Sequence, residues 1–151
     1  MAYPLYSAYT ESEILHASPE RLVQILYELG IKSLESARES IRTKDIRGRV
    51  RHINKAFDVV TELINGLDFE QGKEIAVNYH RIYEYCQRRL IEANTRQSEE
   101  ILLEVQGLVT ELNDAWQIVI TRVSAERTSR LLSPEILPSE KALAGTLSCL
   151  G

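Results

Sequence analysis

The chain has 151 residues, a net charge of −4 and 26% charged residues, and this length and composition are typical of one globular domain with a single core. The acidic balance argues against wholesale binding to nucleic-acid phosphates. No apolar run approaches the roughly 18 residues that a membrane helix needs, and the N-terminus lacks the basic start and apolar stretch of a signal peptide. We therefore expect a protein of the cytosol that does not insert into membranes.

Residues 1–17 contain three tyrosines and two leucines but show no sustained helical period. This composition favours an extended N-terminal arm, with a docking role, over a further packed helix. At the other end, residues 128–151 hold Pro134, Pro138 and scattered leucines. We expect this segment to be a flexible, disordered tail.

The first long helix is predicted to begin at Ser18-Pro19-Glu20 and to run to about Arg42. Serine caps free backbone N–H groups, proline suits the first helical turn, and glutamate complements the helix dipole. Apolar residues then recur at helical spacing along one face. They are Leu22, Ile25, Leu26, Leu29, Leu34, Ala37 and Ile41.

The second helix, from about Arg47 to Asn65, has an unusually wide apolar face made of two stripes. One stripe is Ile53, Phe57, Val60 and Ile64, and the other is Ala56, Val59 and Leu63. A bundle seam needs only a narrow stripe, so such a helix either lies deep in the core or keeps one face for a partner. We favour the central position and keep both interpretations.

Two further helices are predicted, one from Glu70 or Lys73 to Asn94 and one from Ser98 to about Glu126. Ser98 is a second candidate cap, with acidic residues in the following turn. The connections between the four helices are short, as between antiparallel neighbours. The sequence therefore predicts an all-α fold, an antiparallel four-helix bundle over residues 18–127.

The sequence offers little catalytic chemistry. The three histidines stand in no zinc, nucleophile-elbow or nucleotide-binding motif, and the two cysteines, Cys86 and Cys149, have no partner at metal-ligand spacing. A carboxylate-bridged metal bundle needs Glu-x-x-His on two helices, whereas only Glu13 and His16 match, ahead of the first helix. We expect no enzyme activity, no cofactor and no metal.

Basic residues gather around Asp45 at the first turn between helices. They are Arg42, Lys44, Arg47, Arg49 and Arg51. No aromatic residues stand among them to stack on bases, so we interpret the cluster as a solvated surface and not as a nucleic-acid site.

Motifs in consistent order give the chain a recognisable pattern. The arm and first helix supply Tyr6, Tyr9, Ala17-Ser18-Pro19, Leu22 and Leu26-Tyr27. Later segments supply Ile53-Asn-Lys-Ala56, Leu67-Asp68, Glu74-Ile75-Ala76, Tyr83-Glu-Tyr85, Arg88-Arg89-Leu90, Glu92-Ala93-Asn94 and Ala115-Trp116. Over about residues 3–120 the chain thereby resembles the flagellin export chaperone family, FliS. Gly72-Lys73 departs from the Gly-Gly common in that family.

The resemblance implies a cytosolic chaperone of bacterial flagellum biogenesis. Such a protein binds the C-terminal segment of flagellin, prevents its premature polymerisation, and delivers it to the type III export apparatus, where the family contacts the export gate protein FlhA. In the family the N-terminal arm packs on the bundle and is displaced by the cargo.

Candidate contact residues follow from combining this resemblance with the apolar pattern. Residues expected to line a flagellin groove are Val50, Ala56, Val59, Leu63, Tyr79, Tyr83 and Ile91. Residues expected to cap the groove, or to contact the export gate, are Leu5, Tyr6, Tyr9 and Ile14. An equally weighted alternative is that the tyrosines of the arm simply complete the core.

A different class of function stays open beside this one. A helical-bundle regulator or adaptor would bind a folded partner or nucleic acid through the basic turn. Salt dependence separates the two, because phosphate contacts release counterions whereas apolar binding changes little with salt.

Overall fold

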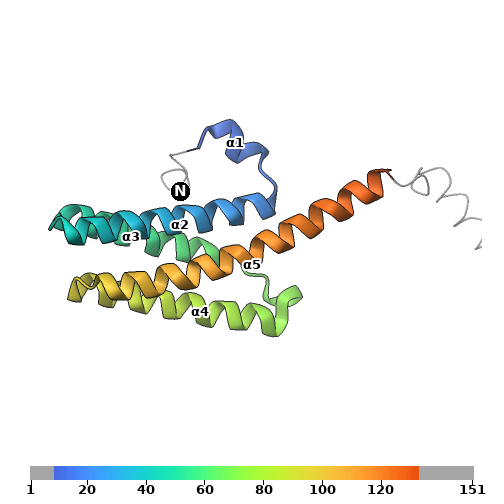
Figure 1. Ribbon diagram of the computed structural model, residues 1–151. Coiled ribbons are helices and arrows are strands. Elements are labelled where there is room, and N and C mark those ends of the chain that lie inside the picture. Colours follow the sequence, from blue (N-terminus) through green and yellow to red (C-terminus); the bar gives the residue numbers. More distant parts are fainter. Residues whose placement is uncertain (1–8, 133–151) are drawn as a thin grey trace, which may run out of the picture. The chain divides into compact units, whose positions relative to one another are not determined.

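The structure is a computed structural model that describes residues 9–132. Within this range the chain forms α-helices and no strands (Figure 1). They are α1 (Glu11–His16), α2 (Pro19–Arg42), α3 (Ile46–Asn65), α4 (Phe69–Arg96) and α5 (Glu99–Leu132). The chain divides into two compact units, Met1–Trp116 and Gln117–Gly151.

The first unit is an antiparallel bundle of α2, α3, α4 and the part of α5 up to Trp116. Short turns join successive helices, and contacts between α2 and α5 fix their opposite directions. Arg38 Nη2, near the end of α2, lies 3.2 Å from Glu99 Oε1 at the start of α5. Trp116 Nε1 donates to the carbonyl of Glu20 in the first turn of α2 at 2.9 Å. The predicted all-α bundle is confirmed.

Each bundle helix begins with a capping side chain. Ser18 accepts from the Arg21 N–H at 3.1 Å, and Ser98 accepts from the Ile101 N–H at 3.2 Å, as predicted from the sequence. Asp45 and Asp68 cap α3 and α4 in the same way. Polar residues of the turns therefore set where the helices start.

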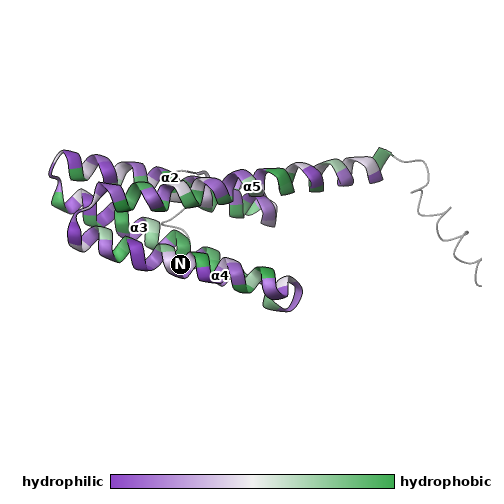
Figure 2. Ribbon diagram, turned by 60° about the horizontal axis from the view of Figure 1, so that its bottom comes forward, coloured by the Kyte–Doolittle hydropathy of each residue, from purple (hydrophilic) through white to green (hydrophobic). Residues whose placement is uncertain are grey.

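The core lies between the four helices of the bundle. Figure 2 shows apolar and polar positions alternating along them, as expected for amphipathic helices. The largest fully buried side chains are Ile25, Leu34, Val59, Cys86, Leu90, Leu102 and Val105. Gly30 lets α2 approach α3 closely, because a Cβ there would lie 3.3 Å from Val59 Cγ1. Ala56, Val59 and Leu63, the second stripe of the wide face, are buried together with Ile53 and Val60 of the first.

Two elements differ from expectation. The arm contains the short helix α1, which Thr10 and Glu13 stabilise through a capping box that helical periodicity does not reveal. Helix α5 continues to Leu132, beyond the expected end near Glu126, so residues 128–132 are helical. Residues 133–151 of the predicted tail lie outside the described residues.

Residues 117–132 form the helical part of the second unit. Large apolar side chains are exposed there, including Ile118, Leu131 and Leu132. None of the helices within residues 9–132 is both long and apolar enough to cross a membrane.

Helix α4 is kinked at Lys73, whose φ of 47° and ψ of −120° are not helical. Only glycine adopts this backbone conformation without strain. The preceding Gly72 is also needed, because a Cβ there would lie 2.9 Å from Ala76 Cβ. The turn after Asp68 and the main part of α4 are therefore two helical pieces, which explains why the sequence suggested two starts.

A Lys73→Gly variant should be more stable than the natural chain. We expect the free energy of unfolding to rise by about 1 kcal/mol, because glycine removes the strain at this position. Denaturant unfolding followed by circular dichroism measures the change. The matched control is Lys32→Gly, which places glycine inside regular α2 and should lower stability by roughly 1 kcal/mol. Equal effects at the two positions would contradict a strained backbone at Lys73.

Candidate binding cavity

An apolar cavity of about 500 Å³ opens at the end of the bundle where α2 begins, α3 ends and α4 begins. Its walls come from these three helices and from Trp116 of α5. The lining residues are Pro19, Leu22, Val23, Leu26, Tyr27, Glu62, Leu63, Gly66, Leu67, Asp68, Gly72, Ile75, Ala76, Tyr79, Tyr83 and Trp116.

The local sequence fixes each wall of this cavity. The Ser18 cap and Pro19 start α2 at the cavity mouth. Gly66 ends α3 there, and the kink at Lys73 carries the first turn of α4 around the opening. The hydrogen bond from Trp116 to the Glu20 carbonyl holds the indole in place. The cavity therefore lies where the apolar faces of these three helix ends meet without filling the space between them.

Two buried tyrosines form part of the cavity wall. The hydroxyls of Tyr27 and Tyr83 lie 2.6 Å apart, and the two side chains are 2% and 4% exposed. Burial raises the pKa of Tyr27 to about 12, although its hydrogen bond with Tyr83 acts in the opposite direction. Burial also raises the pKa of Tyr83. Both rings are therefore neutral at physiological pH. Tyr79 packs beside Tyr83 with ring centroids 6.1 Å apart.

The charged residues in the cavity lining are acidic. Glu62 and Asp68 come from the end of α3 and the turn before α4. Asp68 Oδ1 accepts from the backbone N–H groups of Glu70 and Gln71, both at 3.0 Å. The opening therefore combines an apolar interior with a polar, negatively charged edge.

The structure divides the residues that the sequence suggested for the groove. Leu63, Tyr79 and Tyr83 line the cavity together. Ala56 and Val59 are each 1% exposed and pack inside the bundle. Val50 is half-buried on α3, and Ile91 is 58% exposed on α4, and neither lines the cavity.

Two of the four candidates from the arm, Tyr9 and Ile14, lie within the described residues. The Tyr9 hydroxyl donates to Glu28 Oε2 at 3.0 Å, and Arg21 Nη1 contacts the same carboxylate at 3.3 Å. Ile14 is partly buried against the core. Leu5 and Tyr6 lie outside the described residues.

Several cavity residues were recognised in the sequence only as parts of helical seams or of the family motifs, and not as lining a site. They include Leu22, Leu26, Tyr27, Ile75 and Trp116. Placing the predicted helices antiparallel would have brought the start of the first, the end of the second and the start of the third to one level. The aromatic residues that this arrangement brings together, such as Tyr27, Tyr83 and Trp116, were the sequence signal for an apolar site at that end of the bundle.

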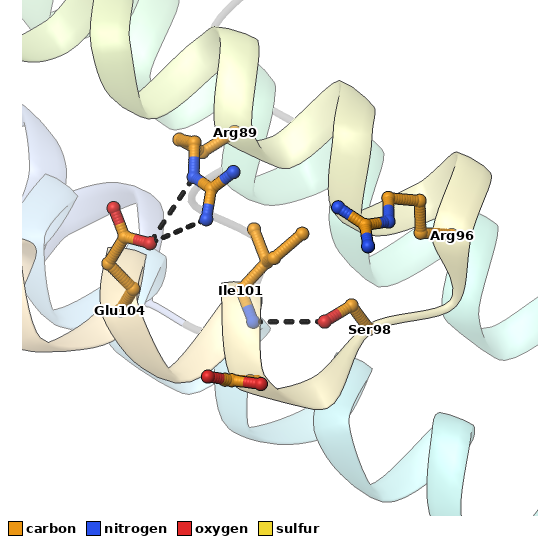
Figure 3. A pocket seen from close by; sticks show the side chains of 6 residues that line it. Arg89, Arg96, Ser98, Ile101 and Glu104 are labelled. Carbon is orange, nitrogen blue, oxygen red and sulfur yellow. Dashed lines mark hydrogen bonds and ion pairs between the residues drawn. The ribbon is translucent and has the colours of Figure 1, made fainter.

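A second, polar pocket of about 430 Å³ lies at the turn between α4 and α5 (Figure 3). Arg89 Nη2 donates to Glu104 Oε2 at 2.7 Å and its Nη1 donates to Glu92 Oε2 at 2.5 Å. Arg96 pairs with Glu92 at 2.9 Å. The hydrogen bond from Arg89 is the main cause that lowers the pKa of Glu104. The Arg89–Glu104 pair joins α4 to α5, and Glu92 pairs with both arginines within α4. These four charges neutralise one another and leave no net charge among them to attract a ligand.

The described residues hold no group of three or more His, Cys, Asp or Glu side chains that is arranged for a metal ion. Glu13 Oε2 instead accepts from the Thr10 N–H at 2.7 Å, and His16 Nδ1 contacts the Ser12 carbonyl at 2.8 Å. In the basic segment, Arg42 pairs with Glu99 and Arg49 Nε donates to Asn94 Oδ1 at 3.2 Å.

A bundle with an open apolar cavity at one end has the construction of a helical binding protein. The family model described as Flagellar protein FliS matches residues 2–123, and the chain belongs to this family. The flagellar secretion chaperone FliS of Salmonella typhimurium is 32% identical over 119 residues, which are 78% of this chain and 88% of the relative.

Other curated relatives carry the same description. The flagellar secretion chaperone FliSB of Pseudomonas aeruginosa is 37% identical over 106 residues, 70% of this chain and 84% of the relative. FliS of Bacillus subtilis is 30% identical over 125 residues, 83% and 90% of the two chains. The family is thus one of secretion chaperones.

Proposed function

We propose that this protein is a cytosolic export chaperone that binds the C-terminal segment of flagellin in the apolar cavity. By covering that segment it prevents premature polymerisation and delivers the subunit to the flagellar type III export apparatus. The cavity is the observation that carries the proposal: sixteen residues from four helices and from the turn between α3 and α4 line it, and most of them are apolar or aromatic.

The chemistry of the cavity suits a segment that orders on binding. Such a segment loses conformational entropy when it binds, so it needs apolar contacts to offset that loss. Leu22, Leu26 and Trp116 offer such contacts, and the edge formed by Glu62 and Asp68 stays in water. The arm residues Leu5, Tyr6, Tyr9 and Ile14 remain our candidates for capping the cavity or for contacting the export gate protein FlhA.

Calorimetry with a synthetic peptide of the flagellin C-terminal helices tests the proposal. We expect saturable binding with a negative heat-capacity change, because apolar surface is buried. The affinity should change little between low and physiological salt. A scrambled peptide of the same composition is the control. Absence of binding, or a steep loss of affinity with salt, would instead favour the regulator that uses the basic turn.

A further inference from the structure

The hydroxyl groups of Tyr27 and Tyr83 carry two hydrogens, and the hydrogen bond between them uses only one. Each phenol carries a single donor hydrogen, and one of the two is spent in the 2.6 Å contact between them. Within residues 9–132 neither hydroxyl has another hydrogen-bond partner. The second hydrogen therefore needs an acceptor from elsewhere, because a buried donor without a partner is costly.

The position of the pair limits where that acceptor comes from. Both tyrosines are at least 96% buried and both line the apolar cavity. The carboxylates of the cavity, Glu62 and Asp68, make no hydrogen bond to either phenol. A segment that fills the cavity displaces water from the pair, so the segment itself then has to supply the acceptor.

We propose that the Tyr27–Tyr83 pair donates one hydrogen bond to a backbone carbonyl of the polypeptide that occupies the cavity. This inference rests on the proposed function and adds a polar anchor to it. An apolar segment brings few side-chain acceptors, but every residue of it carries a carbonyl. Carbonyls inside a helix already accept one backbone hydrogen bond, whereas the last four of a helix and those of an extended stretch accept none and are the better acceptors. We therefore expect the segment in the cavity to present a helix C-terminus or an extended stretch to the pair.

Removal of the hydroxyls tests the anchor. The double variant Tyr27→Phe/Tyr83→Phe keeps both rings and should still fold, since replacing both partners of a buried hydrogen bond by apolar groups is nearly neutral. We expect it to bind the flagellin C-terminal peptide about three- to tenfold more weakly, the equivalent of one neutral hydrogen bond. At least one single variant should bind like the natural protein, because one hydroxyl hydrogen remains for the ligand.

Tyr85→Phe is the matched control, because its hydroxyl contacts Glu104 and it does not line the cavity. A second measurement replaces peptide amides by esters one at a time, which weakens each carbonyl as an acceptor. At one position the ester should weaken binding to the natural protein but not to the double variant.

The outcomes separate the anchor from the proposed function. If the natural protein binds the peptide and the double variant binds it equally well, the anchor is wrong while the chaperone function stands. Ester effects that are the same in both proteins would overturn it as well. If the natural protein does not bind the peptide, both proposals fail.

Discussion

A Val59→Asp variant should lose about 3–5 kcal/mol of its free energy of unfolding, because an uncompensated charge would be buried. Val59 is 1% exposed, and its Cγ1 lies 3.3 Å from the position that a Cβ on Gly30 of α2 would occupy. A carboxylate there has neither water nor a cation. Since whole domains are stable by only about 5–15 kcal/mol, much of the population should unfold. Circular dichroism during thermal and denaturant unfolding measures the loss.

Val77→Asp is the control for this experiment, since it makes the same change at a valine of α4 that is 39% exposed. We expect it to change stability by about 0.5 kcal/mol or less. A Val59→Asp variant that keeps its helicity and stability, yet no longer binds the flagellin peptide, would instead place Val59 on the binding face.

This variant also addresses the ambiguity of the wide apolar face. The sequence showed two adjacent stripes on α3 but not what covers them. In the structure α2 and α4 flank α3, and the glycine at position 30 brings α2 against the second stripe. A central helix therefore needs apolar residues over two faces, and period alone cannot distinguish it from a helix that keeps one face for a partner.

Local chemistry explains which boundaries were predictable. Ser18 and Ser98 were recognised because a cap needs only the residue type and the helix that follows. The end of α5 was misplaced because no glycine or proline lies between Glu126 and Leu132 to mark a stop. Helix α1 was missed because its six residues are too few to show a period.

The cavity was missed in the sequence for a different reason, since helical periodicity by itself does not bring distant residues together. Tyr27, Tyr83 and Trp116 are far apart along the chain and meet only because antiparallel helices place them at one end of the bundle. The kink at Lys73 then decides how the first turn of α4 borders the opening. Neither the relative level of the helices nor the kink follows from helical periodicity.

Two exposed isoleucines of α4 allow the cavity to be tested against another surface of the same helix, where the groove candidate Ile91 lies. Ile75 is 66% exposed and lines the cavity, whereas Ile91 is 58% exposed and lies away from it. Aspartate at either position should leave the fold intact, because both side chains already lie largely in water. The two variants therefore carry the same chemical change at similarly exposed positions, and they differ only in where on α4 the aspartate lies.

An Ile75→Asp variant should bind the flagellin C-terminal peptide about 30-fold more weakly or worse, the effect of losing roughly 2 kcal/mol at an apolar contact. Ile91→Asp should bind like the natural protein. Titration calorimetry gives both affinities, and circular dichroism verifies that both variants are folded. The reverse order of effects would move the binding site to the outer surface of α4 around Ile91, where Val50 of α3 would again be a candidate contact. Equal losses would mean that the bound segment extends over both ends of α4, which an amphipathic segment longer than the cavity permits.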